Sequence, residues 1–218
     1  MARTMARTVA CARLLTADVL RSQRVLLPVI LYAGVLAVLY TGDPGPLPAP
    51  WAASALVLYP VATWLALVVA NSEEPPARLV TVAAAGGTGR VITATLALVL
   101  VADVALSAAA TFWPMVVSHY RLPPDALPLG FCTHLAAAAT GTAIGLLVAR
   151  PLITRIGWSF CVGAVLVTAT AVQSWLPPVG TAVLAVTNGS PVPWTQAALA
   201  VVLAGAAAVV VWAVESRR

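Results

Sequence analysis

The chain has 218 residues, of which 61% are hydrophobic and 9% are charged, and its mean hydropathy is +0.97. A soluble globule of this length needs far more polar surface, so the composition predicts an integral membrane protein. All 12 basic residues are arginine and none is lysine. A phosphate-binding loop that ends in Gly-Lys-Ser/Thr is therefore excluded, and any ATP that drives this protein binds another chain. The arginines are scattered between apolar segments, so the net charge of +5 does not predict a nucleic-acid partner.

Residues 1–24 form a basic leader before the first long apolar run. On a helical wheel the leader separates into an apolar face and a basic face, namely Cys11, Ala12, Leu15, Val19 and Leu20 against Arg13, Arg21 and Arg24. This pattern predicts an amphipathic helix that lies on the cytoplasmic surface of the membrane. The alternative is a basic leader without defined structure that serves only as a topology signal.

Six apolar segments follow the leader, and each approaches the roughly 20 residues that a bilayer requires. They lie at about 25–40, 51–70, 91–117, 129–149, 156–175 and 194–214. The sequence therefore predicts an all-α membrane protein, with a transmembrane domain of six helices over residues 25–214 and a short tail over 215–218. Gly141 and Gly145 form a GxxxG pattern that permits close helix approach, although a chain rich in glycine and alanine also produces it by chance.

The arginines predict how these spans are oriented. If both termini are cytoplasmic, every arginine except Arg121 lies on the inner side, in the leader, the two inner loops and the tail. This distribution is typical of a multi-pass protein of the plasma membrane. Aromatic residues then gather near the outer surface, at Tyr40, Trp51, Trp113, Tyr120, Trp175 and Trp194.

Residues 71–90 form the long polar loop on the predicted inner side. The loop has the features of a short helix that lies between two spans. Asn71 or Ser72 can cap it, Glu73 and Glu74 favour its positive end, and a Pro-Pro pair suits its first turn. Gly86, Gly87 and Gly89 then end it. A second irregular segment, at 177–190, is apolar but too short to span, which predicts a re-entrant or interfacial helix.

Taken together, the amphipathic leader, the six spans, the helix of the 71–90 loop and the apolar segment before the last span resemble an ABC-2 type transporter permease. In that family the loop after the second span has an acid, a helix, small residues and a turn that ends in arginine. Here Glu73 or Glu74 matches the acid, the run from Arg78 to Ala85 matches the helix, and Arg90 closes the turn. The chain departs from the pattern at its Pro-Pro pair and where glycine replaces the turn proline.

The resemblance implies a bacterial exporter subunit that moves a lipophilic or amphipathic substrate and has no catalytic residues of its own. It implies that Glu73, Glu74, Arg78 and Arg90 contact a cytoplasmic ATPase subunit, which binds ATP and magnesium. It also implies a second permease subunit, as a homodimer or a heterodimer, within the lipid of the membrane.

Asp103 lies near the centre of the third span, where a charged carboxylate is costly unless it is paired or hydrated. Either it faces a substrate path or it is a protonated carboxyl bonded to a neighbouring helix. Ser107 lies one turn away and is a possible local partner. No metal site is predicted, because Cys132 and His134 have no further ligands beside them.

Two other classes of function remain open from the sequence. Residues 73–78 spell EExxxR, which resembles the first motif of intramembrane glutamate proteases of the CAAX-processing type. In that family later histidines complete the site, so His134 becomes the candidate here. The other class is a non-catalytic subunit that anchors a complex in the membrane.

Overall fold

The computed structural model of the chain describes residues 2–42, 45–117 and 126–217. Over these residues the chain is all-helical and has no strand. The helices are α1 (Ala2–Ser22), α2 (Leu26–Thr41), α3 (Ala49–Ala70), α4 (Pro75–Ala85), α5 (Thr88–Val117), α6 (Leu127–Val148), α7 (Ile156–Ala171), α8 (Val179–Thr187) and α9 (Trp194–Glu215). Tyr120 and Arg121, which the sequence places in an outer loop, lie outside the described residues.

Within the described residues, four helices are long and apolar enough to cross a membrane: α3, α5, α6 and α9. A fifth candidate is the apolar pair formed by Thr8–Ser22 of α1 and by α2, which is bent by 70°. The chain is therefore an all-α, multi-pass membrane protein. Each of the six predicted apolar segments forms a helix, but α7 ends at Ala171 and has 16 residues. Its rise of about 24 Å is less than the roughly 30 Å of a hydrocarbon core, so the count of six spans stays a prediction.

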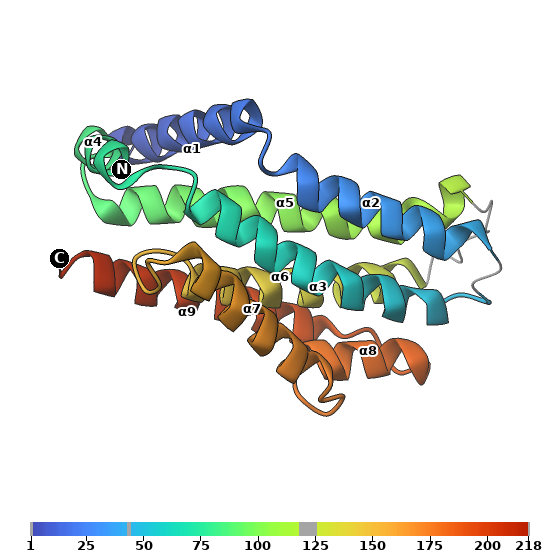
Figure 1. The fold of residues 1–218 in the computed structure, drawn as a ribbon. Coiled ribbons are helices and arrows are strands. Elements are labelled where there is room, and N and C mark those ends of the chain that lie inside the picture. Colours follow the sequence, from blue (N-terminus) through green and yellow to red (C-terminus); the bar gives the residue numbers. More distant parts are fainter. Residues whose placement is uncertain (1, 43–44, 118–125, 218) are drawn as a thin grey trace.

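The long helices run side by side, and α6 lies at their centre (Figure 1). It packs against α3, α5, α7, α8 and α9. In a membrane there is little hydrophobic drive between helices, so close packing depends on small side chains. The buried residues of α6 include a run of four alanines, Ala136–Ala139, and both glycines of the GxxxG pattern. The composition of this helix thus allows it to have neighbours on several sides.

The contact between α3 and α6 is extensive and close. A Cβ atom added to Gly141 would lie 2.4 Å from the carbonyl oxygen of Tyr59. A Cβ atom added to Gly145 would lie 2.5 Å from the carbonyl oxygen of Thr63. Because the obstructing atoms are backbone, they cannot move without shifting the whole helix. The GxxxG pattern is therefore part of a helix interface within this chain.

The leader helix α1 has its apolar face covered by protein. Cys11 and Leu15 are buried in a cluster with Ala85, Val91 and Ala94 of α4 and α5. On the opposite face Arg13 and Arg21 are exposed, whereas Arg24 is exposed in the turn that follows the end of α1 at Ser22. The predicted division into two faces is correct except at Leu20, which is exposed.

At the far end of the bundle from α4, the short helix α8 packs against α3 and α6 (Figure 1). Ala185 and Val186 of α8 are buried there with Trp51 and Leu129. The nine residues of α8 rise about 14 Å, so this helix cannot span a bilayer.

We predict that Gly141→Ala destabilises the protein, because the new methyl group meets the backbone of α3. Overpacking of this kind costs about 1–3 kcal/mol in the free energy of unfolding. The matched control is Gly34→Ala in α2, where an added Cβ has no atom within 4 Å. That change should be neutral or stabilise the helix by roughly 0.5–1 kcal/mol. Unfolding of both variants in detergent checks the contrast, and equal stabilities would contradict the close α3–α6 contact.

Candidate functional site

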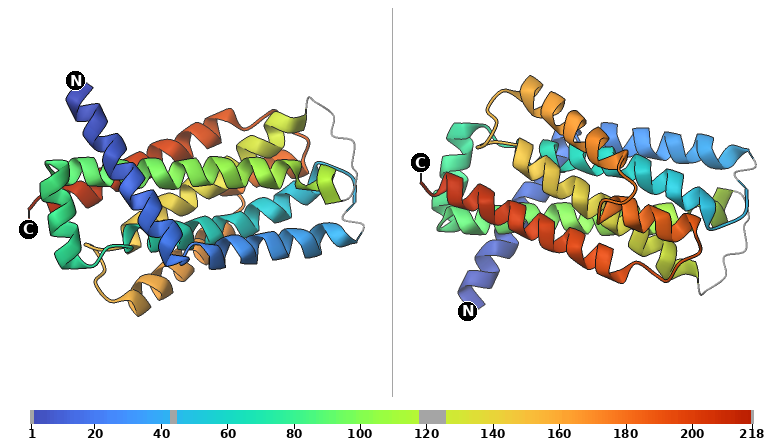
Figure 2. Two further views of the ribbon diagram at one scale, coloured as in Figure 1. Left: turned by 90° about the horizontal axis from the view of Figure 1, so that it is seen from above. Right: turned by 90° about the horizontal axis from the view of Figure 1, so that it is seen from below.

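The helix of the 71–90 loop is α4, and it lies across the end of the bundle at which α9 ends, in contact with α1 (Figure 2). Its N-cap is Glu74, in an extended conformation and without a side-chain cap, and Pro75 and Pro76 begin its first turn. The prediction that Asn71 or Ser72 caps this helix is wrong. The Asn71 amide instead donates to the carbonyl of Leu67 at the end of α3, at 3.0 Å.

Glycine ends α4 as predicted. Gly86 has a φ of 79°, in the left-handed region that side chains other than glycine rarely adopt. The Gly86 N–H donates to the carbonyl of Ala83 at 3.2 Å, and the Gly87 N–H donates to that of Val82 at 2.9 Å. These two bonds form a Schellman motif, which turns the chain sharply from α4 into α5.

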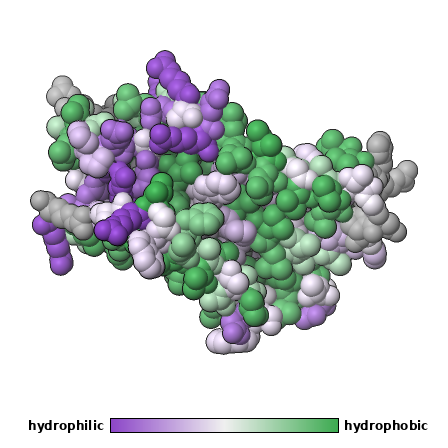
Figure 3. All heavy atoms as spheres, in the orientation of Figure 1, coloured by the Kyte–Doolittle hydropathy of each residue, from purple (hydrophilic) through white to green (hydrophobic). Residues whose placement is uncertain are grey.

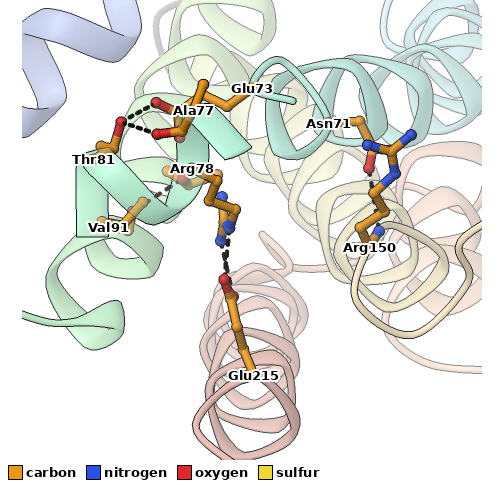
Figure 4. Close-up of polar contacts among 9 residues, drawn as sticks. Asn71, Glu73, Ala77, Arg78, Thr81, Val91, Arg150 and Glu215 are labelled. Carbon is orange, nitrogen blue, oxygen red and sulfur yellow. Dashed lines mark hydrogen bonds and ion pairs between the residues drawn. The ribbon is translucent and has the colours of Figure 1, made fainter. Parts of the chain in front are cut away.

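An ion pair ties α4 to the last residue of α9. The Arg78 Nε donates to Oε1 of Glu215 at 2.6 Å, and the Arg78 Nη2 donates to Oε2 at 2.9 Å (Figure 4). The two side chains are 20% and 17% exposed. Burial alone would lower the pKa of Arg78, but the hydrogen bonds and charge of Glu215 more than offset this effect and raise the pKa. The Arg78 guanidinium therefore stays charged at neutral pH, and its charge is lost only as the pH rises through that raised pKa.

Two other predicted contact residues hold the ends of α4. Glu73 Oε1 accepts a hydrogen bond from the Thr81 hydroxyl at 2.5 Å, which fixes the turn before α4 against its second half. The Arg90 Nη1 donates to the carbonyls of Ala85 at 2.8 Å and Gly86 at 2.6 Å. These are carbonyls that the end of a helix leaves without a partner.

The four predicted coupling residues therefore lie around one helix, but they differ in what they offer to a partner. Glu73, Arg78 and Arg90 bond within the chain, and only Glu74 is exposed without such a bond. The exposed surface of α4 is apolar instead. Leu79 is 72% exposed and Val80 is 70% exposed.

Sequence reasoning missed Thr81 and Glu215. Thr81 follows Glu73 by eight residues. Glu73 precedes α4, so the rules for side-chain spacing within a helix do not predict this bond. Glu215 is 137 residues from Arg78. The one feature of the sequence that could have indicated Glu215 is its position. It is the single acid at the end of the last span, and that end is predicted to lie on the same side of the membrane as Arg78.

Asp103 bonds to a neighbouring helix and not to Ser107. Its Oδ2 accepts a hydrogen bond from the Thr142 hydroxyl of α6 at 2.7 Å, and both Asp103 and Ser107 are fully buried. Among the described residues, Asp103 Oδ1 and the Ser107 hydroxyl have no hydrogen-bond partner. The geometry supports the structural interpretation of Asp103, as a link between α5 and α6.

His134 is also bonded within the bundle, far from the EExxxR motif. Its Nδ1 lies 2.7 Å from the carbonyl of Gly130, so Nδ1 carries the hydrogen and Nε2 accepts from the Ser54 hydroxyl at 2.8 Å. Ser54 is near the start of α3, whereas Glu73 follows its end, and the helix rises about 24 Å between Ser54 and Ala70. The structure therefore does not bring His134 and Glu73 into one site.

Comparison with known proteins does not assign the chain to a family. Neither a protein-family model, nor a curated protein, nor a solved structure matches the chain. Within the described residues, no group of three His, Cys, Asp or Glu side chains is arranged to hold a metal ion.

We predict that Arg78→Ala loosens α4, because the change leaves Glu215 half-buried without its cation. Hydrogen bonds between charged groups contribute about 1.5–3 kcal/mol, so amide exchange in α4 should accelerate about 10- to 100-fold. The reversed pair, Arg78→Glu with Glu215→Arg, should restore much of the protection. Hydrogen exchange measured by mass spectrometry distinguishes the three proteins, and unchanged exchange in Arg78→Ala would contradict the role of the pair.

We predict that Asp103→Asn is tolerated and that Asp103→Ala is not. The asparagine carbonyl still accepts from Thr142, and its amide takes the place of the unpartnered oxygen Oδ1. Alanine leaves the Thr142 hydroxyl without its acceptor, at a cost of about 1–3 kcal/mol in the free energy of unfolding. Thermal unfolding in detergent compares the two variants, and equal loss in both would point to a need for the carboxyl itself.

Proposed function

We propose that this chain is the permease subunit of an ATP-driven exporter of the ABC-2 type, and that α4 is its contact with a separate ATPase. In this proposal the membrane is the plasma membrane of a bacterium and two permease subunits form the transporter. ATP and magnesium bind only to the ATPase. The observation that supports the proposal most directly is α4 itself, a short helix fixed across the end of the bundle with an exposed apolar surface.

The positions of the first and last helices support a topology of six spans with both chain termini in the cytoplasm. The first and last helices reach the same end of the bundle, as an even number of crossings requires (Figure 1). Polar residues gather at this end, while apolar atoms cover most of the rest of the face (Figure 3). Arg78 and Arg150 line one cavity there, although they belong to different loops. Arginine at one end is typical of the cytoplasmic side.

The attachment of α4 to three long helices favours a role in transmitting movement from a partner to the membrane spans. The helix is joined to α9 by the Arg78 ion pair, to α3 by the short turn before it and to α5 by the Schellman motif. A partner that moves α4 therefore moves the ends of three long helices with it. Leu79 and Val80 remain available for that partner, because helices with exposed apolar residues bind well in protein grooves.

An apolar cavity between α3 and α7 supports a lipophilic substrate. It measures about 250 Å³ and is lined by Pro60, Trp64 and Leu67 of α3 and by Phe160, Gly163 and Val167 of α7. Trp64 and Phe160 meet edge to face, with ring centroids 6.4 Å apart. Asp103 and Ser107 do not line this cavity, so the proposed substrate contacts lie on α3 and α7.

We predict that Leu79→Asp abolishes copurification of a soluble ATPase with the tagged chain in mild detergent. A charge in an apolar groove is desolvated without a partner, so binding should weaken at least tenfold. Arg78→Glu and Arg90→Glu should weaken binding less, because these residues position α4 and do not form its exposed surface.

The matched control is Leu20→Asp, which places the same charge on α1, where Leu20 is 64% exposed. This variant should retain the ATPase. Normal ATPase binding by Leu79→Asp would rule out α4 as the contact. If the wild-type chain is recovered alone even after crosslinking, the permease proposal fails and the anchor subunit becomes the better interpretation.

A further inference from the structure

The outer face of α1 is left uncovered by the rest of the described chain. The opposite face is buried against the bundle, at residues such as Cys11 and Leu15. Arg13 and Arg21 are exposed on the outer face, and Arg24 is exposed in the turn before α2. These three arginines form the basic surface of α1. The sequence predicts that the apolar face of this helix meets the membrane, but protein covers that face, so an external partner must fit the arginines instead.

The basic surface of α1 has no matching negative charge within the described chain. The guanidinium groups of Arg13, Arg21 and Arg24 make no ion pair with any described residue. The sequence of α1 contains one acid, Asp18, which is exposed and makes no ion pair with a described residue either. The surface therefore keeps an excess of positive charge, which favours a negatively charged partner.

The start of α2 shows at what level of the membrane this surface lies. α2 begins at Leu26, and most of its exposed residues are apolar, such as Leu27 at 58% and Ile30 at 63%. A helix with this surface belongs in hydrocarbon, so its start marks the boundary with the headgroups. Arg21 and Arg24 lie within five residues of Leu26. Because an unpaired arginine inside the hydrocarbon is costly, both are held at the level of the headgroups.

The direction of α1 keeps Arg13 near the same level. The helix is bent by 70° from α2, and Figure 2 shows it crossing the side of the bundle obliquely before it leads into α2. With α2 upright in the membrane, α1 therefore runs nearly along the membrane surface. From Arg21 back to Arg13 the helix rises about 12 Å, of which only about 4 Å is directed along the α2 axis. This is within the roughly 5–7 Å depth of a headgroup layer.

We propose that the basic surface of α1 binds anionic phospholipids of the adjoining leaflet, with the lipid phosphates at Arg13, Arg21 and Arg24. A guanidinium donates parallel N–H groups that a phosphate accepts in pairs. A lipid with a net negative charge is favoured over a zwitterionic lipid, whose ammonium offsets the phosphate. The acyl chains then lie along the exposed residues of α2, including Leu27 and Ile30.

This surface does not depend on the proposed transport function. It requires only that α2 lies in the bilayer, with α1 at the level of the headgroups. The covered face of α1 packs against Ala85, the last residue of α4. A lipid that holds α1 in place therefore also supports α4, and the position of α4 becomes sensitive to the charge of the membrane.

The test is native mass spectrometry of the purified full-length chain, delipidated in detergent and titrated with phosphatidylglycerol, phosphatidylethanolamine or phosphatidylcholine of identical acyl chains. An arginine near an anionic surface contributes about fivefold in affinity. Phosphatidylglycerol should therefore be retained at least tenfold better than either zwitterionic lipid. Equal retention of the three lipids would overturn the proposal and leave an acidic protein segment as the better partner for this surface.

Charge variants locate the bound lipid on α1. Arg21→Gln should weaken retention of phosphatidylglycerol about fivefold, and the triple change to glutamine at Arg13, Arg21 and Arg24 should remove the preference for it. The triple change to lysine keeps the charges and should keep most of the preference. Asp18→Asn should strengthen retention, because it removes the one acid of α1.

The matched control for Arg21→Gln is Arg217→Gln, which removes an exposed arginine beyond the end of α9 and should bind lipid normally. Equal retention by these two variants would contradict a site on α1, as would a preference for phosphatidylglycerol that survives in the triple glutamine variant. Melting temperatures without lipid identify any variant that fails to fold, and the single variants decide the outcome if the triple variant does.

Discussion

The close approach of α3 and α6 is the constraint on which the rest of the fold depends. Inside a bilayer, helices gain little from hiding apolar surface, because lipid is equally apolar, and they associate through van der Waals contact and a few polar bonds. Gly141 and Gly145 remove the side chains that would keep the two backbones apart. On the other side of α6, buried alanines of α9 such as Ala200, Ala204 and Ala207 serve the same purpose. The bundle is therefore held by small residues, and its large apolar residues are mostly left for lipid.

The end of the bundle that holds α4 is stabilised by different forces. There the contacts are ionic and polar, and each involves a side chain that is partly open to solvent. Hydrogen bonds of this kind contribute little when exposed, but several that act on one short helix restrict it together. The core can thus remain rigid while α4 is held by a few bonds with which a partner can compete. This division suits a protein that must transmit a movement without losing its packing.

The helices could largely be predicted from the sequence, and their contacts could not. Long apolar runs and glycine clusters are local signals, so the ends of α3, α6 and α9 and the stop at Gly86 were found from composition and turn chemistry. The cap of α4 was misassigned, because Asn71 satisfies the end of α3 instead, and propensity does not distinguish the two ends of a short loop. The partners of Arg78 and Asp103 lie 137 and 39 residues away. A single sequence has no information on which helices become neighbours, and so neither bond was accessible.

The bond between Asp103 and Thr142 also has a consequence for biogenesis. A ribosome delivers α5 to the insertion machinery before α6 exists, so the carboxyl of Asp103 reaches the bilayer without the hydroxyl of Thr142 that later donates to it. A charged aspartate at the centre of a helix costs about 2.5–3.5 kcal/mol on insertion scales, an amount that the apolar length of α5 can offset. Only when the next hydrophobic segment leaves the ribosome does the hydroxyl of Thr142 become available. Co-translational assembly of this protein therefore has two stages, because α5 can enter the bilayer on its own hydrophobicity and the bond that joins it to α6 forms afterwards.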